Sequence, residues 1–141
     1  VVAREFRFHV SMCGSLGVGG SLLEWTPEEW AQAAALVALY KDIRPIVQLG
    51  DQHRLHPAQG QGFTALQYIS KDKAAGVLFA FRVHLAEPDL IPPITLRGLD
   101  PLALYRVEGY AEARSGQAWM NTGLVLELRD LQSTVRRIWR E

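Results

Sequence analysis

The sequence has a single cysteine, no excess of charge of either sign and no long apolar run. Because Cys13 has no second cysteine to pair with, no internal disulfide can form, and nothing points to an oxidising compartment. Fifteen Lys and Arg residues balance fifteen Asp and Glu residues. This balance argues against nucleic-acid and membrane-surface partners, which select broad basic surfaces. No run reaches the length of a membrane span and no signal-peptide pattern opens the sequence, so we expect a cytoplasmic protein.

What the sequence has is enough apolar material for a core. Of its 141 residues, 48% are hydrophobic, and the length corresponds to about one domain. The chain starts "VVAREFRFHV", without a methionine, and enters a regular pattern almost at once. We therefore expect it to be part of a longer polypeptide.

The first pattern is a strict alternation over Glu5 to Met12. The even-numbered residues are apolar and the odd-numbered ones are polar, and this period of two predicts a strand with one apolar face. The apolar set is Phe6, Phe8, Val10 and Met12, and the other face carries Arg7, His9 and Ser11. A glycine-rich turn, "SMCGSLGVGGS" (11–21), follows.

A helix is predicted after this turn. Thr26 is a suitable N-cap, Pro27 suits the first helical position and Glu29 completes a capping box. Apolar residues then recur at helical spacing and form one stripe: Ala33, Leu36, Val37, Tyr40, Ile43 and Val47. Pro45 is expected to kink or end the helix near Asp42, because proline cannot donate the hydrogen bond that continues it.

After Gly50 the helical period disappears and short strand patterns alternate with turn residues. The predicted strands are 63–70, 76–85, 94–99, 104–110, 124–128 and 133–139. Short strands with frequent turns are typical of an antiparallel β-sandwich or barrel. The fold class is therefore a strand and a helix (residues 1–49) followed by an all-β domain (50–141).

The glycine-rich turn does not match a phosphate-binding motif. A P-loop requires Lys and Ser or Thr after its last glycine, but Ser21 and Leu22 follow Gly20. A dinucleotide fingerprint starting at Gly17 requires glycine where Leu22 stands. On spacing alone, a tight surface loop is the better interpretation.

No other cluster forms a self-contained catalytic or metal set. His53 and His56 lack further ligands and would face opposite sides of an extended segment, so no metal or other cofactor is expected. Cys13 could act as a nucleophile only with a histidine partner, and in a strand His9 would be too distant. The carboxylates are scattered, with no spacing that marks a glycosidase pair.

Several longer blocks, however, resemble one family. These are "RFHVSMCG" (7–14), "YKDIRP" (40–45), "GLDPLALYRV" (98–107) and "WMNTGL" (119–124). Their order and spacing are similar to those of the α-galactosidases of glycoside hydrolase family 36, and the resemblance covers nearly the whole chain. It implies that Arg4 to Met12 is the last strand of a (β/α)8 barrel, that the helix from Pro27 is the last barrel helix, and that an antiparallel β-domain starts near Gly50.

The resemblance also implies where the chemistry lies. The family is retaining and uses two aspartates, in motifs that precede the first residue of this chain, so no catalytic residue can be assigned here. The turn would be the last barrel loop and would approach the galactose pocket. The alternation would then point Ser11 and Cys13 toward the substrate, and Gly14, at the start of the turn, is also predicted to lie close to it. Filling of the barrel mouth is the more conservative interpretation.

The sequence therefore predicts the structural C-terminal part of an enzyme that binds α-galactosides. Two alternatives stay open: a free-standing carbohydrate-binding module and a small enzyme acting through Cys13. The module would need exposed aromatic residues on one sheet face, for which the candidates are Tyr68, Tyr110, Trp119 and Trp139. If barrel elements are missing, we expect one of two outcomes. Either the apolar helix stripe and the Phe6, Phe8 and Val10 face fold back on the β-domain, or the chain pairs with a second copy through the open edge of its first strand, giving a homo-oligomer.

Overall fold

The computed structural model describes residues 2–56, 62–84 and 90–141. The elements are, in chain order, α1 (Arg4–Met12), a 3-10 turn η1 (Leu22–Glu24), α2 (Pro27–Leu49), β1 (Asp51–His56), β2 (Phe63–Ile69), β3 (Ala75–Arg82), β4 (Leu104–Val107), β5 (Arg114–Ser115), α3 (Gly116–Asn121) and β6 (Gln132–Arg140). Leu85, at the end of the predicted strand 76–85, lies outside the described residues.

The first segment corrects a prediction, because Arg4–Met12 is a helix and not a strand. Phe8 and Met12 are four residues apart and both are buried, whereas Val10, which the alternation placed on the same face, is 53% exposed. The alternating run fits a helix as well, since positions i and i+4 share a helix face. The apolar pattern over nine residues was therefore ambiguous, and packing against the sheet decides it.

The second helix begins as predicted and ends later. Thr26 accepts a hydrogen bond from the Glu29 backbone, and the Glu29 side chain accepts one from Thr26, which confirms the capping box. The helix continues through Pro45 to Leu49, so it does not end near Asp42, and the alternative of a kink there stays a prediction. Pro45 removes only the bond to the carbonyl of Lys41, and both residues lie on the solvent-exposed side of the helix.

The strands form one six-stranded sheet in the order β1-β2-β3-β6-β4-β5, and every pairing between neighbours is antiparallel. The predicted strands 63–70, 76–85, 104–110 and 133–139 correspond to β2, β3, β4 and β6. The predicted strands 94–99 and 124–128 meet only in an isolated bridge between Ile94 and Leu124. β1 and the short β5 were not predicted.

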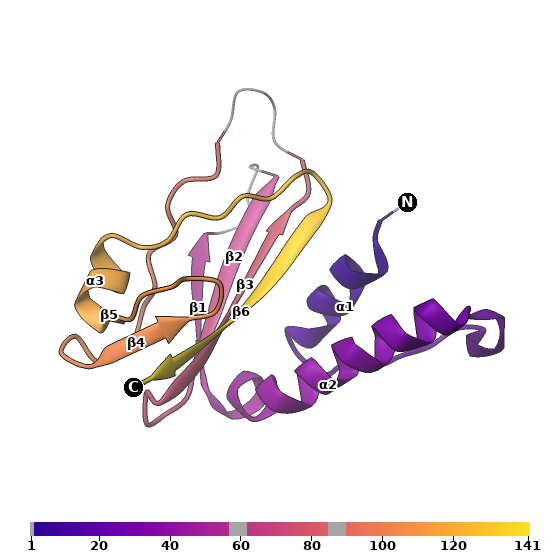
Figure 1. Cartoon of the computed structure of the whole chain (residues 1–141), viewed down its shortest axis with the longest axis horizontal. Helices are drawn as coiled ribbons and strands as arrows, with labels where there is room; N and C mark the ends of the chain where they lie inside the picture. Colours follow the sequence, from indigo (N-terminus) through magenta and orange to yellow (C-terminus); the bar gives the residue numbers. More distant parts are fainter. Residues whose placement is uncertain (1, 57–61, 85–89) are drawn as a thin grey trace.

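The described sheet is therefore not one half of a two-sheet sandwich, which corrects the predicted β-sandwich. Helices α1 and α2 lie on one side of the sheet, and α3 with its flanking segments lies on the other (Figure 1). The second side is closed by extended loop segments around Ile94–Leu99 and Leu124–Leu126, packed about the fully buried Trp119. Irregular chain thus takes the place of the second sheet.

The residues of the predicted apolar helix stripe are buried within this chain, except Val37, which is half-buried. Residues of α1 and α2 share one hydrophobic cluster with Tyr68, Val77, Phe79 and Phe81 of the sheet. The Phe6 ring meets the Phe81 ring edge-on at 5.5 Å. The stripe therefore packs against the sheet of its own chain, and pairing with a second copy stays a prediction. Because helices and sheet share this cluster, the domain division at residues 49 and 50 stays a prediction.

Candidate functional site

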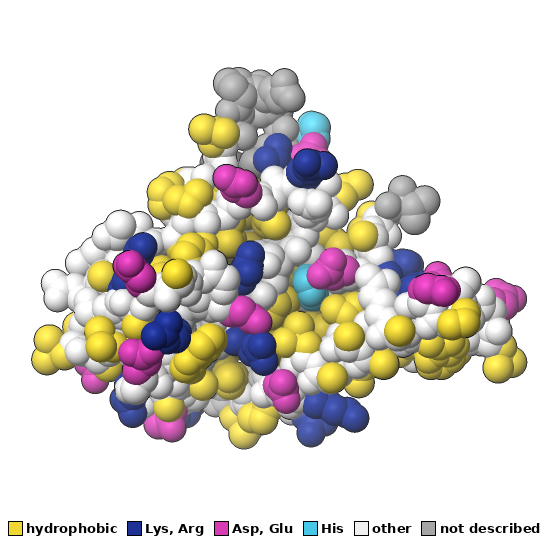
Figure 2. Space-filling model, viewed as in Figure 1, with side chains coloured by type: hydrophobic (Ala, Val, Ile, Leu, Met, Phe, Trp, Pro, Cys, Tyr) yellow, Lys and Arg dark blue, Asp and Glu magenta, His cyan; other side chains and the backbone are white. Residues whose placement is uncertain are grey.

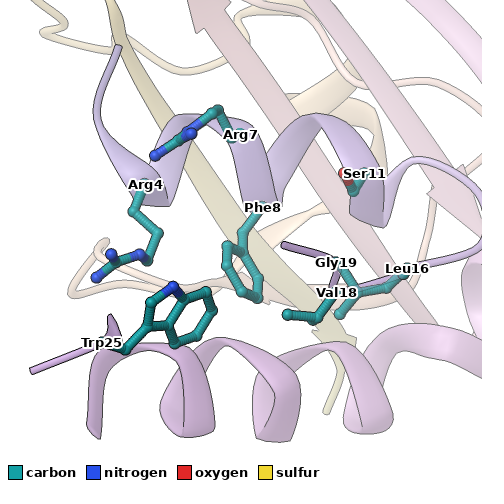
Figure 3. A pocket seen from close by; sticks show the side chains of 9 residues that line it. Arg4, Arg7, Phe8, Ser11, Leu16, Val18, Gly19 and Trp25 are labelled. Carbon is teal, nitrogen blue, oxygen red and sulfur yellow. The ribbon is translucent and has the colours of Figure 1, made fainter. Parts of the chain in front are cut away.

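A surface cavity of about 220 Å³ lies where α1, the glycine-rich segment and the start of α2 meet. Figure 3 shows its walls: α1 on one side, Leu16, Val18 and Gly19 on another, and the Trp25 indole below. This cavity, which we call the loop cavity, includes Ser11, one of the residues predicted to lie close to substrate.

Helical spacing brings the α1 side chains to this cavity. Arg4, Arg7, Phe8 and Ser11 are separated by three, four and seven positions and therefore lie on one face of the helix. A strand would have separated Phe8 from Arg7 and Ser11. The combination of apolar ring, guanidinium and hydroxyl in the lining is thus a product of the helix that the sequence analysis did not predict.

The aromatic wall is held in place by charge. The Arg4 guanidinium lies over the Trp25 ring, 4.8 Å from its centroid, and donates a hydrogen bond to Glu29. Trp25 also packs against Trp30, with ring centroids 5.2 Å apart. The hydrogen bond from the Thr26 backbone, followed by that from Arg4, lowers the pKa of the Glu29 carboxyl. Glu29 therefore stays ionised, and its carboxylate both caps α2 and binds Arg4.

The polar groups of the loop cavity suit binding and not proton transfer. The backbone N–H of Arg7 donates to the Ala3 carbonyl, whereas its guanidinium has no ion-pair or hydrogen-bond partner within the described ranges and is available to a ligand. Ser11 supplies a hydroxyl, and Gly17 and Gly19 present backbone. No carboxylate is part of the lining. General acid–base chemistry of the glycosidase type requires two carboxyl groups, so these walls can hold a polar ligand but cannot cleave a glycosidic bond.

The three residues predicted to lie close to substrate separate in the structure. Ser11 lines the loop cavity, whereas Cys13 and Gly14 do not. The Cys13 thiol turns back to donate to the His9 carbonyl at 3.4 Å, and burial raises its pKa to about 12. A thiol with such a pKa stays protonated at neutral pH and is a poor nucleophile. Gly14 is exposed at the end of α1.

Two tyrosines that the sequence analysis did not connect to this region fix the start of the loop. The Tyr40 hydroxyl donates to the Gly14 carbonyl at 2.7 Å, and the Tyr68 hydroxyl donates to the Cys13 carbonyl at 2.8 Å. The Gln52 amide in turn donates to Tyr68 at 2.8 Å. Helix α2 and strand β2 thus both hold the end of α1, and only the tertiary structure brings these groups together.

His9 ties α1 to the sheet. Its Nδ1 lies 2.8 Å from the Ser133 hydroxyl of β6, and the side chain is 3% exposed. Desolvation lowers the His9 pKa to about 4, so the ring is neutral at pH 7. Glu5 approaches Nε2 only at 3.9 Å. The sequence analysis assigned His9 to the polar face of a strand, whereas in the structure it is buried and joins α1 to β6 through the contact with Ser133.

The glycines of the loop are not required by close packing in the described chain. An added Cβ at Gly14, Gly17, Gly19 or Gly20 would meet nothing within 4 Å, and only Gly20 has a positive φ, of +113°. The glycine positions of the loop therefore face open space and not other parts of the described chain.

The two histidines of the "HRLH" run (53–56) are not part of a metal-binding cluster in the described ranges. His53 and His56 both belong to β1, where the register shifts between Arg54 and His56. Among the residues that the structure describes, no group of three or more His, Cys, Asp or Glu side chains is placed to hold a metal ion. Within those same ranges, no helix has both the length and the apolar character needed to cross a bilayer.

Comparison with known proteins identifies what this architecture resembles. Residues 63–138 match the model of the glycosyl hydrolase family 36 C-terminal domain. A probable α-galactosidase C of Aspergillus terreus is 39% identical over 120 residues, which are 84% of this chain and 16% of the relative. The α-galactosidase AgaA of Geobacillus stearothermophilus is 32% identical over 142 residues, or 99% of this chain and 19% of the relative.

The solved structures agree over the whole chain. The family 36 α-galactosidase AgaB of Geobacillus stearothermophilus superposes with a TM-score of 0.93 at 29% identity, covering 100% of this chain and 20% of that one. Variants of AgaA superpose with a TM-score of 0.92 and were solved with raffinose and with stachyose. The chain thus spans about a fifth of the length of the proteins it matches, or less.

Proposed function

Because the chain belongs to glycoside hydrolase family 36, with residues 63–138 as its C-terminal domain, we propose that it is the C-terminal part of an α-galactosidase that hydrolyses terminal α-galactosides. Raffinose and stachyose, which were bound to AgaA variants, are the first substrates to test. The observation that carries this proposal is the superposition of the entire chain, helices and sheet together, on the family 36 enzyme AgaB.

Within such an enzyme the chain has a structural role. Catalysis by a retaining glycosidase requires a nucleophilic and an acid–base carboxyl group on either side of the scissile bond. The loop cavity has arginine, serine and aromatic walls without a carboxylate, which supports placing both catalytic groups in other segments of the polypeptide. We further propose that α2 is an outer helix of the catalytic barrel.

The exposed side of α2 supports this placement. Trp30 is 47% exposed and Leu49 is 73% exposed, and alanines 31, 34, 35 and 38 also face outward. Figure 2 shows hydrophobic side chains exposed along α2 on the viewed face. An outer barrel helix buries one side against its neighbours, and small residues permit close approach.

The experiment compares two polypeptides on p-nitrophenyl α-galactoside. The 141-residue chain should release no nitrophenol above the buffer rate, whereas the longer gene product, extended upstream through the expected barrel, should hydrolyse the substrate. Turnover by the short chain would contradict the structural role. Failure of a well-folded longer product on this substrate, raffinose and stachyose would contradict the α-galactosidase assignment.

The alternative enzyme acting through Cys13 receives no support from the site. The thiol is partly buried, has a raised pKa and donates to a backbone carbonyl. The other alternative, a carbohydrate-binding module, has one specific observation in its favour, a groove beside Trp139. A cytoplasmic location and assembly into a homo-oligomer remain part of the proposal for the whole enzyme.

A further inference from the structure

A second groove lies between the C-terminal half of α2 and the adjoining ends of β3 and β6. Its volume is about 380 Å³, within the range of small-ligand sites, and it shares no residue with the loop cavity. The α2 wall consists of Asp42, Ile43 and Ile46, and the strand wall includes Gly76, Arg137 and Trp139. We call it the Trp139 groove.

The alternation of β6 places the Trp139 indole on the helix side of the sheet. Ser133 and Arg137 contact α1 and α2 respectively, whereas Ile138 packs in the opposite core. Trp139 is therefore on the same side as Arg137. Its cross-strand partners are Ala75 on β3 and Arg106 on β4.

This environment leaves a large aromatic surface open. Ala75 is too small to cover an indole, and the Arg106 side chain is turned to Glu141 and the Ala111 carbonyl. Trp139 is accordingly 41% exposed. A large aromatic side chain that is buried on one side and open into a groove is a platform for a flat, weakly polar surface.

The mouth of the groove carries fixed polar groups without a net positive charge. Glu108 accepts from Arg137 Nη2 at 2.8 Å and from Nε at 3.1 Å, which fixes the guanidinium. Asp42 Oδ2 lies 3.8 Å from Arg137 Nη1 and is 69% exposed. The Asp42 carboxylate can accept further hydrogen bonds, and one edge of the guanidinium can donate.

We propose that the Trp139 groove binds one hexopyranose unit of an oligosaccharide, apart from any site of hydrolysis. A pyranose has C–H groups on its ring faces and hydroxyls around its edge. The indole would cover one ring face, while Asp42 accepts from hydroxyls and Arg137 donates to them.

The charges argue against other ligands. Arg137 is matched by Glu108 and Asp42, so an anion such as phosphate would meet a carboxylate and find no uncompensated cation. A wholly apolar side chain would fit the isoleucine wall but would make no hydrogen bond with Asp42 or with the open edge of the Arg137 guanidinium. A neutral, polyhydroxylated ring satisfies both walls. The inference goes beyond the proposed function, because binding here needs no catalytic aspartate.

The test follows the four tryptophan indole N–H signals of the full 141-residue chain by NMR during titration with raffinose, with inorganic phosphate as a second probe. Trp139→Phe assigns the Trp139 signal. Raffinose should shift this signal in a saturable way, with a dissociation constant on the order of millimolar, and phosphate should not. Absence of saturable binding, or a shift centred on Trp25, overturns the proposal.

Matched variants separate the site from general effects. Trp139→Ala should weaken raffinose binding at least tenfold, Asp42→Asn should weaken it severalfold, and Trp30→Ala, equally exposed but remote from the groove lining, should leave it unchanged. The folded state of each variant is checked by circular dichroism. Equal loss in Trp30→Ala overturns the assignment.

The longer gene product tests whether another segment of the same polypeptide, and not a saccharide, occupies the groove. If another segment of that polypeptide covers the groove, acrylamide will quench Trp139 far less there than in the 141-residue chain, and the saccharide proposal fails. Hydrolysis of p-nitrophenyl α-galactoside by the longer product is measured separately, with no substitution in the groove. This readout keeps failure of the groove proposal distinct from failure of the α-galactosidase assignment.

Discussion

The two sides of the sheet are closed in different ways. On the α3 side, Tyr105 and Trp119 are fully buried, and each has its polar atom bonded to backbone: the indole donates to the Tyr105 carbonyl at 2.9 Å, and the Tyr105 hydroxyl donates to the Lys73 carbonyl at 2.9 Å. On the helix side, α1 and α2 are fastened through His9, Tyr40 and Tyr68 but keep exposed apolar surface such as Val10 and Trp30.

This difference concerns how the core on each side of the sheet is closed. On the α3 side the polar atoms of Trp119 and Tyr105 have backbone partners, whereas His56 Nδ1 and Arg136 Nε are buried without a hydrogen-bond partner. Gln67, also fully buried, spans the same side: it donates to the Arg97 carbonyl at 2.8 Å and accepts from the Arg97 backbone at 2.9 Å. The helix side has a core against the sheet and an outer surface suited to further contacts.

The largest expected effect is on the closed side. Trp119→Ala removes the largest fully buried side chain and should lower the free energy of unfolding by about 3–5 kcal/mol. Trp30→Ala, on the open side, should change it by less than about 1 kcal/mol. Urea denaturation followed by circular dichroism measures both. Similar losses for the two variants would mean that the sides do not differ as described.

The next largest expected effect is a dependence of stability on pH, caused by His9, which joins α1 to the sheet. His9 has a folded-state pKa of about 4 against 6.5 when unfolded, so the unfolded chain binds the proton more readily. Stability should therefore fall as pH decreases from about 6.5 to about 4 and then level off, with a total loss of about 3 kcal/mol.

Urea midpoints measured across this pH range test the effect. His9→Gln should flatten the dependence, because it removes the titrating group, whereas His53→Gln should preserve it. An unchanged slope in His9→Gln would show that a different group is responsible.

The smallest effect compares glycines of the two regions. At Gly116 an added Cβ would lie 2.0 Å from the Asp100 carbonyl oxygen, so Gly116→Ala should cost about 1–3 kcal/mol. At Gly17 nothing lies within 4 Å, and Gly17→Ala should be within about 0.5 kcal/mol of the parent. Thermal unfolding distinguishes the two. A large loss for Gly17→Ala in the 141-residue chain would reveal a constraint absent from the described contacts.

Local chemistry explains which predictions succeeded. The start of α2 was predictable because Thr26, Pro27 and Glu29 act through contacts within one turn. Strands β2, β3, β4 and β6 were recognisable because their apolar residues are regularly spaced. The family followed from short blocks in a fixed order. Each of these signals is carried by residues close together in the chain.

The remaining features depended on distant partners. The alternation in Arg4–Met12 fits a strand or a helix, and the burial of Phe8 and Met12 against α2 and the sheet selects the helix. That choice in turn brings Arg7 and Ser11 to the loop cavity and directs Cys13 away from it. The sandwich was predicted from a series of short strands with frequent turns, yet two of those segments, 94–99 and 124–128, close the core as irregular chain. The sequence by itself determined the family, the α2 cap and the central strands, because local patterns specify them. Only the tertiary structure decided the form of α1, the second layer and the grouping of side chains into cavities, because these depend on contacts between residues far apart in the chain.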